Sequence, residues 1–445
     1  MPIEYLGLSS INGPLIVLEG VQDAFYDEIV EFIVGGNQKR IGRIIELYED
    51  KAVIQVFEGS EGMSLVNTHT RLTGHPMEIG LSREMLGRTF NGIGQPIDDL
   101  GPIVPRKKQD VNGLPLNPVR REYPRNYIRT GISAIDGLTT LIRGQKLPIF
   151  SGNGLPHDQL AAQIVKQASL GEDSGEEFAI VFAAMGVKHD VADFFRRTFE
   201  ESGVADHVAM FLNLANDPVV ERLITPKVAL TVAEYLAFEQ NMHILVILTD
   251  MTSFAEAMRE VSSSKGEIPS RKGFPGYLYS ELAAIYERAG IVEGTGGSVT
   301  QIPILTMPND DITHPIPDLT GYITEGQIVL DRNLNGQSIY PPISVLPSLS
   351  RLMKDGIGEG YTREDHQDLA NQLFSAYAKV GDARNLASVI GEDELSPIDK
   401  EYLAFGKEFE EKYIGQGAEE NRTIEETLDL GWELLEGCQE KNSTV

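Results

Sequence analysis

The chain has 445 residues, with 38 Lys and Arg against 66 Asp and Glu, and therefore a formal net charge of −28 at pH 7. This acidic excess argues against a partner whose phosphate backbone must be neutralised, so we do not expect a nucleic-acid motor. The length suggests about three domains.

The cysteine count and the apolar runs indicate where the protein works. The single cysteine, Cys438, cannot form an internal disulfide, and the first residues show no basic-then-apolar export signal. The clearest apolar run, residues 244–248, is far shorter than the roughly 20 residues of a membrane-spanning helix. We therefore expect a cytoplasmic protein whose association with a membrane is peripheral and made through partners.

Residues 1–75 have the pattern of an all-β domain. Two short runs rich in β-branched residues, 28–34 and 52–57, are separated by turn signals at 35–37 and 49–51. Several short strands in so small a segment predict an N-terminal β-barrel.

Residues 76–350 change to apolar strands that alternate with amphipathic helices. Strands are predicted at 179–182, 208–212 and 244–249, and helices at 191–200 and 227–240. This alternation predicts an α/β domain with a mostly parallel sheet covered by helices.

A degenerate phosphate-binding loop lies in this α/β segment. Residues 148–150 have the pattern of a strand end and 159–167 that of a helix, so the loop between them occupies the place of a P-loop, G-x-x-x-x-G-K-[ST]. The four defining positions of that pattern hold Ser151, Pro156, His157 and Asp158.

None of these side chains suits a triphosphate. Pro156 lacks an amide donor, His157 is mostly neutral at pH 7, and Asp158 adds a carboxylate beside the phosphates. We therefore do not expect tight binding and hydrolysis of ATP at this loop. The candidates for holding a phosphate loosely through backbone amides are Gly152, Asn153 and Gly154.

Two further positions bear on nucleotide chemistry. Asp250 follows a buried strand, where an acid can orient magnesium, but a helical pattern begins at Ser253 and favours a helix cap instead. A catalytic NTPase also needs a carboxylate that positions water, usually after the strand that follows the loop helix. That place holds Val187, and the neighbouring Lys188 and His189 are interpreted as solvated side chains.

The glycine-rich segment 294–298 resembles a dinucleotide loop only superficially. No strand-then-helix context surrounds it, so we interpret it as a turn. The prediction places this turn between a helix at 278–289 and a strand at 299–305.

Arg351 follows a proline-rich approach at 340–347. Prolines stiffen the backbone, and an arginine just beyond them can present its planar charged group from a rigid base. Such a group could stabilise a γ-phosphate held by a neighbouring subunit. From composition alone, a surface ion pair is the commoner role for such a residue.

Residues 351–445 become helical and more acidic, with 8 Lys and Arg against 20 Asp and Glu in the part from 361 to 445. We expect a helical bundle whose acidic side chains form a solvated face, or else a docking surface. Helix starts are signalled by Ser396 before Pro397 and by the capping box of Thr423 and Glu426. The apolar positions at helical spacing are Leu369, Leu373, Tyr377, Val380, Tyr402, Phe405, Phe409 and Tyr413.

Several long strings, in the same order along the chain, resemble the B subunit of V-type and archaeal A-type rotary ATPases. The resemblance runs essentially from end to end. One departure is Ser344, where the family pattern leads us to expect asparagine or another residue of the Asp/Asn/His set, and it puts the local hydrogen bonding in question. The matching segments are 151–164, 182–187, 274–290, 295–327 and 341–353.

The resemblance implies an N-terminal β-barrel, a central P-loop-type nucleotide-binding domain and a C-terminal helical bundle. It also implies three copies that alternate with three catalytic A subunits in an A3B3 head, together with rotor-stalk and peripheral-stalk partners. In the family the A subunit binds ATP and magnesium, whereas B is non-catalytic and regulatory. Arg351 matches the family arginine that reaches the nucleotide in the A subunit. The resemblance leaves open whether the motor moves protons or sodium ions.

Two alternatives to this interpretation are an autonomous homohexameric ATPase or helicase and a purely structural spacer. The first predicts turnover by the purified chain and a basic channel, whereas the chain has a histidine in place of the loop lysine and a strongly acidic total. The second shares the degenerate loop and differs only in giving Arg351 no role.

Overall fold

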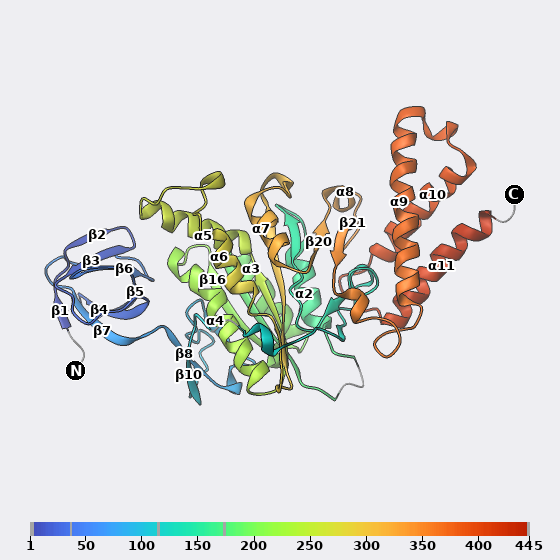
Figure 1. Cartoon of the computed structure of the whole chain (residues 1–445). Helices are drawn as coiled ribbons and strands as arrows, with labels where there is room; N and C mark the ends of the chain where they lie inside the picture. The colour runs from blue at the N-terminus through green and yellow to red at the C-terminus, as the bar shows by residue number, and fades with distance from the viewer. Residues whose placement is uncertain (1–3, 36–37, 114–115, 172–174, 443–445) are drawn as a thin grey trace.

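A computed structural model describes residues 4–35, 38–113, 116–171 and 175–442, with side chains to residue 437 (Figure 1). The chain forms three parts in a row: a β-sheet domain, a central α/β domain and a group of helices at the C-terminal end. This arrangement confirms the predicted fold class. Residues 36 and 37 of the first predicted turn and the side chain of Cys438 lie outside the described part.

The N-terminal part is a curved antiparallel sheet with the described strands in the order β1-β7-β4-β5-β6-β3-β2. Residues such as Val30, Phe32 and Ile54 are fully buried on the inner face of the curved sheet, because alternate side chains of each strand point to the same face. The predicted strands at 28–34 and 52–57 are confirmed to within one residue. The strands are β1 (Glu4–Leu6), β2 (Ser10–Asn12), β3 (Leu15–Glu19), β4 (Glu28–Val34), β5 (Gln38–Tyr48), β6 (Lys51–Val56) and β7 (His69–Pro76).

The central domain is built on a sheet with the strand order β21-β20-β14-β19-β17-β15-β16-β9. The neighbouring strands from β20 to β9 are parallel, and only β21 on this path runs antiparallel, to β20. The strands are β9 (Thr89–Asn91), β14 (Ile149–Gly152), β15 (Phe178–Val187), β16 (Val208–Leu214), β17 (His243–Thr249), β19 (Ser298–Met307), β20 (Gly326–Leu330) and β21 (Ile343–Ser350).

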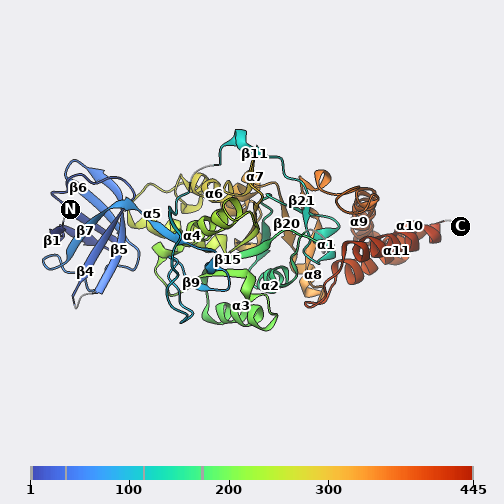
Figure 2. The same cartoon turned by 90° about the horizontal axis from the view of Figure 1, so that it is seen from below.

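Helices cover both faces of this sheet (Figure 2). Alternate residues of β15 show the two sides: Val181 packs with α4, α5 and α6, whereas Phe182 packs with α2 and α3. Both residues are fully buried, as expected of a parallel sheet between two helical layers. The helices are α2 (His157–Gln167), α3 (His189–Glu201), α4 (Val219–Phe238), α5 (Met251–Ser264), α6 (Leu278–Tyr286) and α7 (Pro315–Ile323).

In this domain one predicted helix start was wrong and one short strand was missed. Helix α4 begins at Val219 and runs through Pro226, whereas the sequence pattern predicted a helix at 227–240. Burial of most of α4 compensates for the amide that a proline lacks. The segment 294–298 is a turn, but it joins the short strand β18 (Gly290–Val292) to β19, so a strand intervenes after the helix.

The C-terminal part consists of α9 (His366–Ile390), α10 (Pro397–Glu408), a π-helical turn (Phe409–Ile414) and α11 (Ile424–Asn442). Both predicted helix starts are confirmed: Ser396 Oγ accepts the amide of Asp399, and Thr423 and Glu426 form the reciprocal capping box. The apolar positions predicted at helical spacing pack into one cluster, with Tyr402 partly buried at its margin. No helix in the described ranges combines the length and apolar character that a membrane crossing requires.

Candidate functional site

The degenerate loop has the strand–loop–helix geometry of a P-loop, since β14 ends at Gly152 and α2 begins at His157. Two of its amides, however, already have partners within the loop. The amide of Leu155 donates to Gly152 O at 3.1 Å, and the amide of His157 donates to Leu155 O at 2.9 Å. These two N–H groups are therefore turned toward loop carbonyls instead of toward a ligand.

The side chains at the defining positions also bond to one another. Ser151 Oγ and His157 Nδ1 lie 2.9 Å apart, so the histidine folds back on the loop. The carboxylate of Asp158 lies in the first turn of α2, where burial raises its pKa, His157 lowers it, and the charges of Asp250 and Asp190 raise it. A phosphate would add further negative charge at a place where one carboxylate is already disfavoured.

An ion pair from two other segments closes the loop. Arg332 begins α8 (Arg332–Gly336), and its Nε and Nη2 atoms donate to the two carboxylate oxygens of Asp310 at 2.6 and 2.8 Å. The Nη2 atom also donates to Asn153 O at 2.9 Å. A Cβ atom at Gly152 would meet Asp310 Oδ1, so the carboxylate lies directly against the loop backbone. Sequence reasoning missed the contact of this pair with the loop, because 179 positions separate Arg332 from Asn153.

Asp250 acts as a helix cap, as predicted. Its Oδ1 accepts the amide of Thr252 at 2.8 Å at the start of α5 and the amide of Thr306 at 3.2 Å. Its Oδ2 accepts Thr306 Oγ1 at 2.6 Å. Both carboxylate oxygens are thus engaged within the protein. Across the described residues, no group of three or more His, Cys, Asp or Glu side chains is arranged to hold a metal ion.

The position expected to hold a water-orienting carboxylate is the last residue of β15, Val187, whose side chain is almost completely buried. Lys188 is the N-cap residue of α3 and His189 its first residue, and both are exposed, in agreement with the interpretation as solvated side chains. His157 and Val187 therefore occupy the two positions at which a hydrolytic site has its lysine and its water-orienting carboxylate.

Arg351 is the first residue after β21 and is exposed. Its backbone amide donates to Glu325 O at 2.9 Å, which fixes the main chain at this point. Among the described residues, no acidic side chain lies within 4.0 Å of its guanidinium, so the surface ion pair that composition favoured is not formed.

Arg351 and the degenerate loop lie at opposite edges of the sheet. Because β21 is antiparallel, its last residue, Ser350, pairs with Gly326 at the start of β20, whereas Ser151 is level with Leu330 at the end of β20. Four residues of strand amount to about 13 Å, and two strand spacings add about 10 Å sideways. Arg351 therefore cannot serve the loop of its own chain.

Ser344, the departure from the family pattern, lies near the start of β21 opposite Val329. Its carbonyl accepts Ser348 Oγ at 2.5 Å, and Ser348 Oγ in turn accepts the amide of Val329 at 2.9 Å. The local hydrogen bonding is thus made through the backbone of Ser344, so it does not depend on which side chain stands there.

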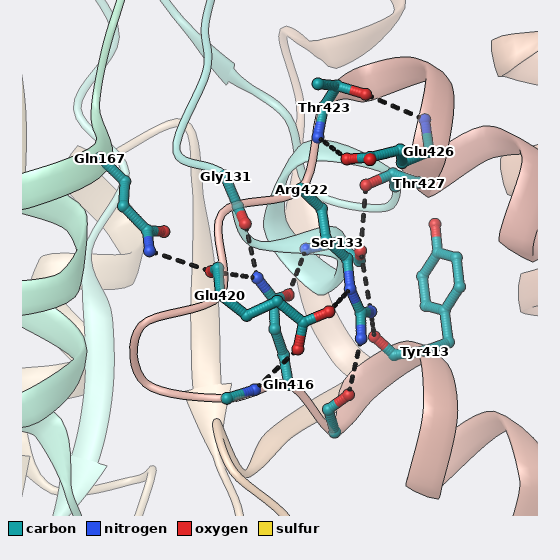
Figure 3. A network of polar contacts seen from close by, with 12 residues as sticks. Gly131, Ser133, Gln167, Tyr413, Gln416, Glu420, Arg422, Thr423, Glu426 and Thr427 are labelled. Carbon is teal, nitrogen blue, oxygen red and sulfur yellow. Dashed lines mark hydrogen bonds and ion pairs between the residues drawn. The ribbon is translucent and has the colours of Figure 1, made fainter.

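The loop helix α2 is also tied to the C-terminal helices by a polar junction (Figure 3). Gln167 Nε2 donates to Glu420 O at 2.9 Å, and Gln416 Nε2 donates to Gly131 O at 2.6 Å. Arg422 Nη1 donates to Ser133 Oγ and to Tyr413 O, each at 3.2 Å. Three of these four bonds join segments 253 to 289 positions apart, which is why no local pattern pointed to them.

Comparison with protein families matches the chain in three successive stretches. Residues 131–350 match the nucleotide-binding domain of the ATP synthase alpha/beta family, residues 8–74 match its beta-barrel domain, and residues 355–444 match the C-terminal domain of V and A type ATP synthase. The chain belongs to this family.

Relatives within the family narrow the assignment. A V-type ATP synthase beta chain 2 of Clostridium tetani is 66% identical over 433 residues, which cover 97% of this chain and 94% of the relative. A V-type ATP synthase beta chain of Halothermothrix orenii is 63% identical over 432 residues, covering 97% and 93%. The solved ATP synthase subunit NeqB of Nanoarcheaum equitans superposes with a TM-score of 0.76 at 40% identity, covering 96% of this chain and 99% of that one.

These likenesses place the chain among the V-type ATP synthase beta chains, as the resemblance led us to expect. It is a head subunit of a rotary ATPase and part of a multi-subunit complex, with a domain of the nucleotide-binding type.

Proposed function

We propose that this chain is the non-catalytic, regulatory B subunit of the head, present as three copies that alternate with three catalytic A subunits. Its domains are then residues 1–75, 76–350 and 351–445. In this assembly the head couples ATP hydrolysis or synthesis to the transport of protons or sodium ions, and the chain reaches the membrane peripherally, through the stalks and the ion-translocating sector.

The observation that carries the proposal is the separation of two features on one sheet. The loop edge is occupied by its own hydrogen bonds and by the pair of Arg332 and Asp310, whereas Arg351 at the opposite edge is exposed and has no ion-pair partner in the described part of the chain. A charged group that cannot reach its own loop is suited to the loop of a neighbour. In a ring of alternating subunits, that neighbour is the A subunit.

In the proposed mechanism the A subunit binds ATP and supplies the lysine, the magnesium ligand and the water-positioning carboxylate. This chain closes against it and places the Arg351 guanidinium beside the γ-phosphate, where negative charge increases during phosphoryl transfer. The planar group of arginine can donate two parallel hydrogen bonds to phosphate oxygens. Closure of the interface and nucleotide state thereby become coupled.

Titration calorimetry tests the division of labour. MgATP titrated into the purified chain is expected to give no heat of tight binding, and the same titration into the chain mixed with its A partner is expected to give heat. Rapid ATP turnover by the purified chain would contradict the proposal and favour the autonomous ATPase.

Substitution of Arg351 by alanine tests the arginine finger itself. In the assembled complex this variant is expected to lose about 10³- to 10⁵-fold in turnover, the range measured for arginine fingers supplied in trans. A loss of only a few-fold would favour the structural spacer.

A further inference from the structure

We infer that Gln145 is a positioning residue for Arg351: its side chain fixes the two strand ends from which the arginine projects. This inference rests on the proposed function, since it concerns how the arginine is presented to the neighbouring nucleotide. Gln145 is completely buried and was not singled out by its sequence context.

The side-chain amide of Gln145 makes three hydrogen bonds. Its Nε2 donates to Ser350 Oγ at 2.9 Å and to Glu325 O at 3.4 Å, and its Oε1 accepts the amide of Ile142 at 2.9 Å. Ser350 ends β21 and Glu325 immediately precedes β20, so one amide group joins the adjacent ends of the two strands.

These are the two residues that hold the backbone of Arg351. Ser350 is its covalent neighbour, and Glu325 O accepts its amide at 2.9 Å. Glu325 O is thus shared between the Arg351 amide and the Gln145 side chain. A change in the position of Glu325 or Ser350 would be passed directly to the arginine.

The surroundings keep this support rigid. Ser350 Oγ donates to Thr140 O at 2.9 Å, so the hydroxyl that receives the Gln145 amide is itself fixed. The carboxylate of Glu325 accepts both the amide of Lys146, at 3.0 Å, and the Nζ of Lys146, at 2.5 Å. Lys146 is 5% exposed, so this ion pair lies mostly out of solvent.

Placement matters because an arginine finger acts through geometry. A misplacement of about 1 Å at a reacting centre can cost about 10²-fold in rate, even when its cause lies away from the chemistry. Gln145 touches neither nucleotide nor partner in this arrangement. Its effect on turnover would pass through Arg351.

The test is the variant Gln145→Met in the complex reconstituted with the A partner, with MgATP as substrate. Methionine nearly conserves volume but cannot donate or accept these hydrogen bonds. We expect kcat to fall about 10-fold while KM for MgATP changes less than about 2-fold. The control is Gln55→Met, since Gln55 is a similarly buried glutamine in the N-terminal sheet whose side-chain Oε1 accepts from Arg43 Nε. This control is expected to retain the parent kcat.

A double substitution separates positioning from general damage. In an Arg351→Ala background, adding Gln145→Met is expected to leave the residual turnover unchanged, because there is no longer an arginine to position. An undiminished 10-fold loss in that background, or a parent kcat for Gln145→Met alone, would overturn the inference. If Arg351→Ala has little effect, the proposed function fails instead, so the two failures are distinct.

A second variant covers the case in which Gln145→Met does not assemble. Ser350→Ala removes the hydroxyl between Gln145 and Thr140 with a much smaller change in the core. It is expected to lower kcat about 3-fold with KM unchanged, and again to have no effect in the Arg351→Ala background. Additive losses there would overturn the inference equally.

Discussion

The two edges of the central sheet differ in how their polar groups are satisfied. At the loop edge, the polar side chains bond in two pairs. The Ser151 hydroxyl bonds to the His157 imidazole, and the Arg332 guanidinium bonds to the Asp310 carboxylate. At the opposite edge, a buried hydrogen-bonded support ends in Arg351, an exposed side chain with no described acidic partner.

Under the proposed function, one nucleotide-binding fold keeps two functions apart. Phosphate binding depends on the loop after a parallel strand, whereas the arginine depends on the end of the antiparallel strand β21. Among the described residues, the loop side chains and the support of Arg351 share no hydrogen bond, so we expect substitutions at the loop to leave that support untouched. Under the proposed function, the chain binds no nucleotide tightly itself and still completes the site of a neighbour.

The largest expected effect tests the role of Arg351, at the edge opposite the loop. Arg351→Lys keeps the charge but loses the planar group, so we expect turnover of the reconstituted complex to fall at least about 10³-fold, with little recovery over Arg351→Ala. Steady-state turnover of MgATP provides the measurement.

Lys354 supplies the matched control for Arg351, because it is an exposed cation three positions away. Lys354→Ala is expected to retain turnover within about 2-fold. An equal loss in both variants would mean that this edge contributes only general positive charge, and the comparison would then fail.

The next effect concerns the polar junction, where Gln416 joins the segment 131–133 to the C-terminal part of the chain. Gln416→Ala removes bonds to Gly131 O, Glu420 O and the amide of Ser133, and leaves the buried amide of Ser133 without its partner. We expect the free energy of unfolding to fall by about 2–3 kcal/mol, measured by chemical denaturation of the purified chain.

The control for Gln416 is Gln367→Ala, since the Gln367 amide makes an exposed bond to Asn371. This change is expected to cost less than about 0.5 kcal/mol. Equal costs for the two variants would mean that the junction is no more than a surface contact.

Sequence alone predicted the parts of the fold that depend on local signals. The strand at 28–34 coincides with β4, and the caps at Ser396 and Thr423 have the predicted hydrogen bonds. The loop was identified as degenerate because residue type alone excludes a P-loop at Pro156 and His157.

The missed features depend on contacts between distant segments. Gln145 bonds to Ser350 across 205 positions, and Arg332 bonds to Asn153 across 179. No local sequence pattern predicts either contact. The start of α4 was missed because Pro226 is a helix-breaking signal, and burial in the core outweighs it. The exposure and free charge of Arg351 likewise required the structure, since composition favoured an ion pair.

A smaller effect is expected from repair of the loop. The triple substitution Pro156→Gly, His157→Lys and Asp158→Thr restores the defining residues at three of the four positions. We expect MgADP affinity of the purified chain to rise about 10-fold, since a charge-assisted bond replaces a repulsive carboxylate. ATP turnover is expected to stay absent, because Val187 cannot orient water.

The control for the repaired loop is His189→Lys, which places the same new charge at the first residue of another helix of this sheet. It is expected to leave nucleotide affinity unchanged. Turnover by the repaired chain would show that neither the pair of Arg332 and Asp310 nor the missing carboxylate prevents hydrolysis at this loop. The three substituted residues alone would then account for its inactivity.

The smallest effect is a pH dependence at Asp158. Burial raises the pKa of this carboxyl, so its ionised form is less favourable in the folded chain than in the unfolded chain. Asp158→Asn is therefore expected to stabilise the chain at pH 7 by about 0.5 kcal/mol, the scale of a modest substitution. The gain should shrink as pH falls through the raised pKa and vanish below the ordinary aspartate value of about 3.9.

Thermal unfolding of parent and variant between pH 4 and pH 8 measures this gain, with Asp368→Asn as the control. Asp368 lies in the first turn of α9, as Asp158 does in α2, but it is exposed, so its charge is expected to favour the helix start and its removal to cost stability. Opposite signs for the two substitutions would show that the loop edge is unfavourable for negative charge where an ordinary helix start is favourable. If Asp158→Asn instead lowered stability at pH 7, the carboxylate would stabilise the folded chain at this loop. Electrostatic exclusion of phosphate would then no longer be part of the difference between the two edges.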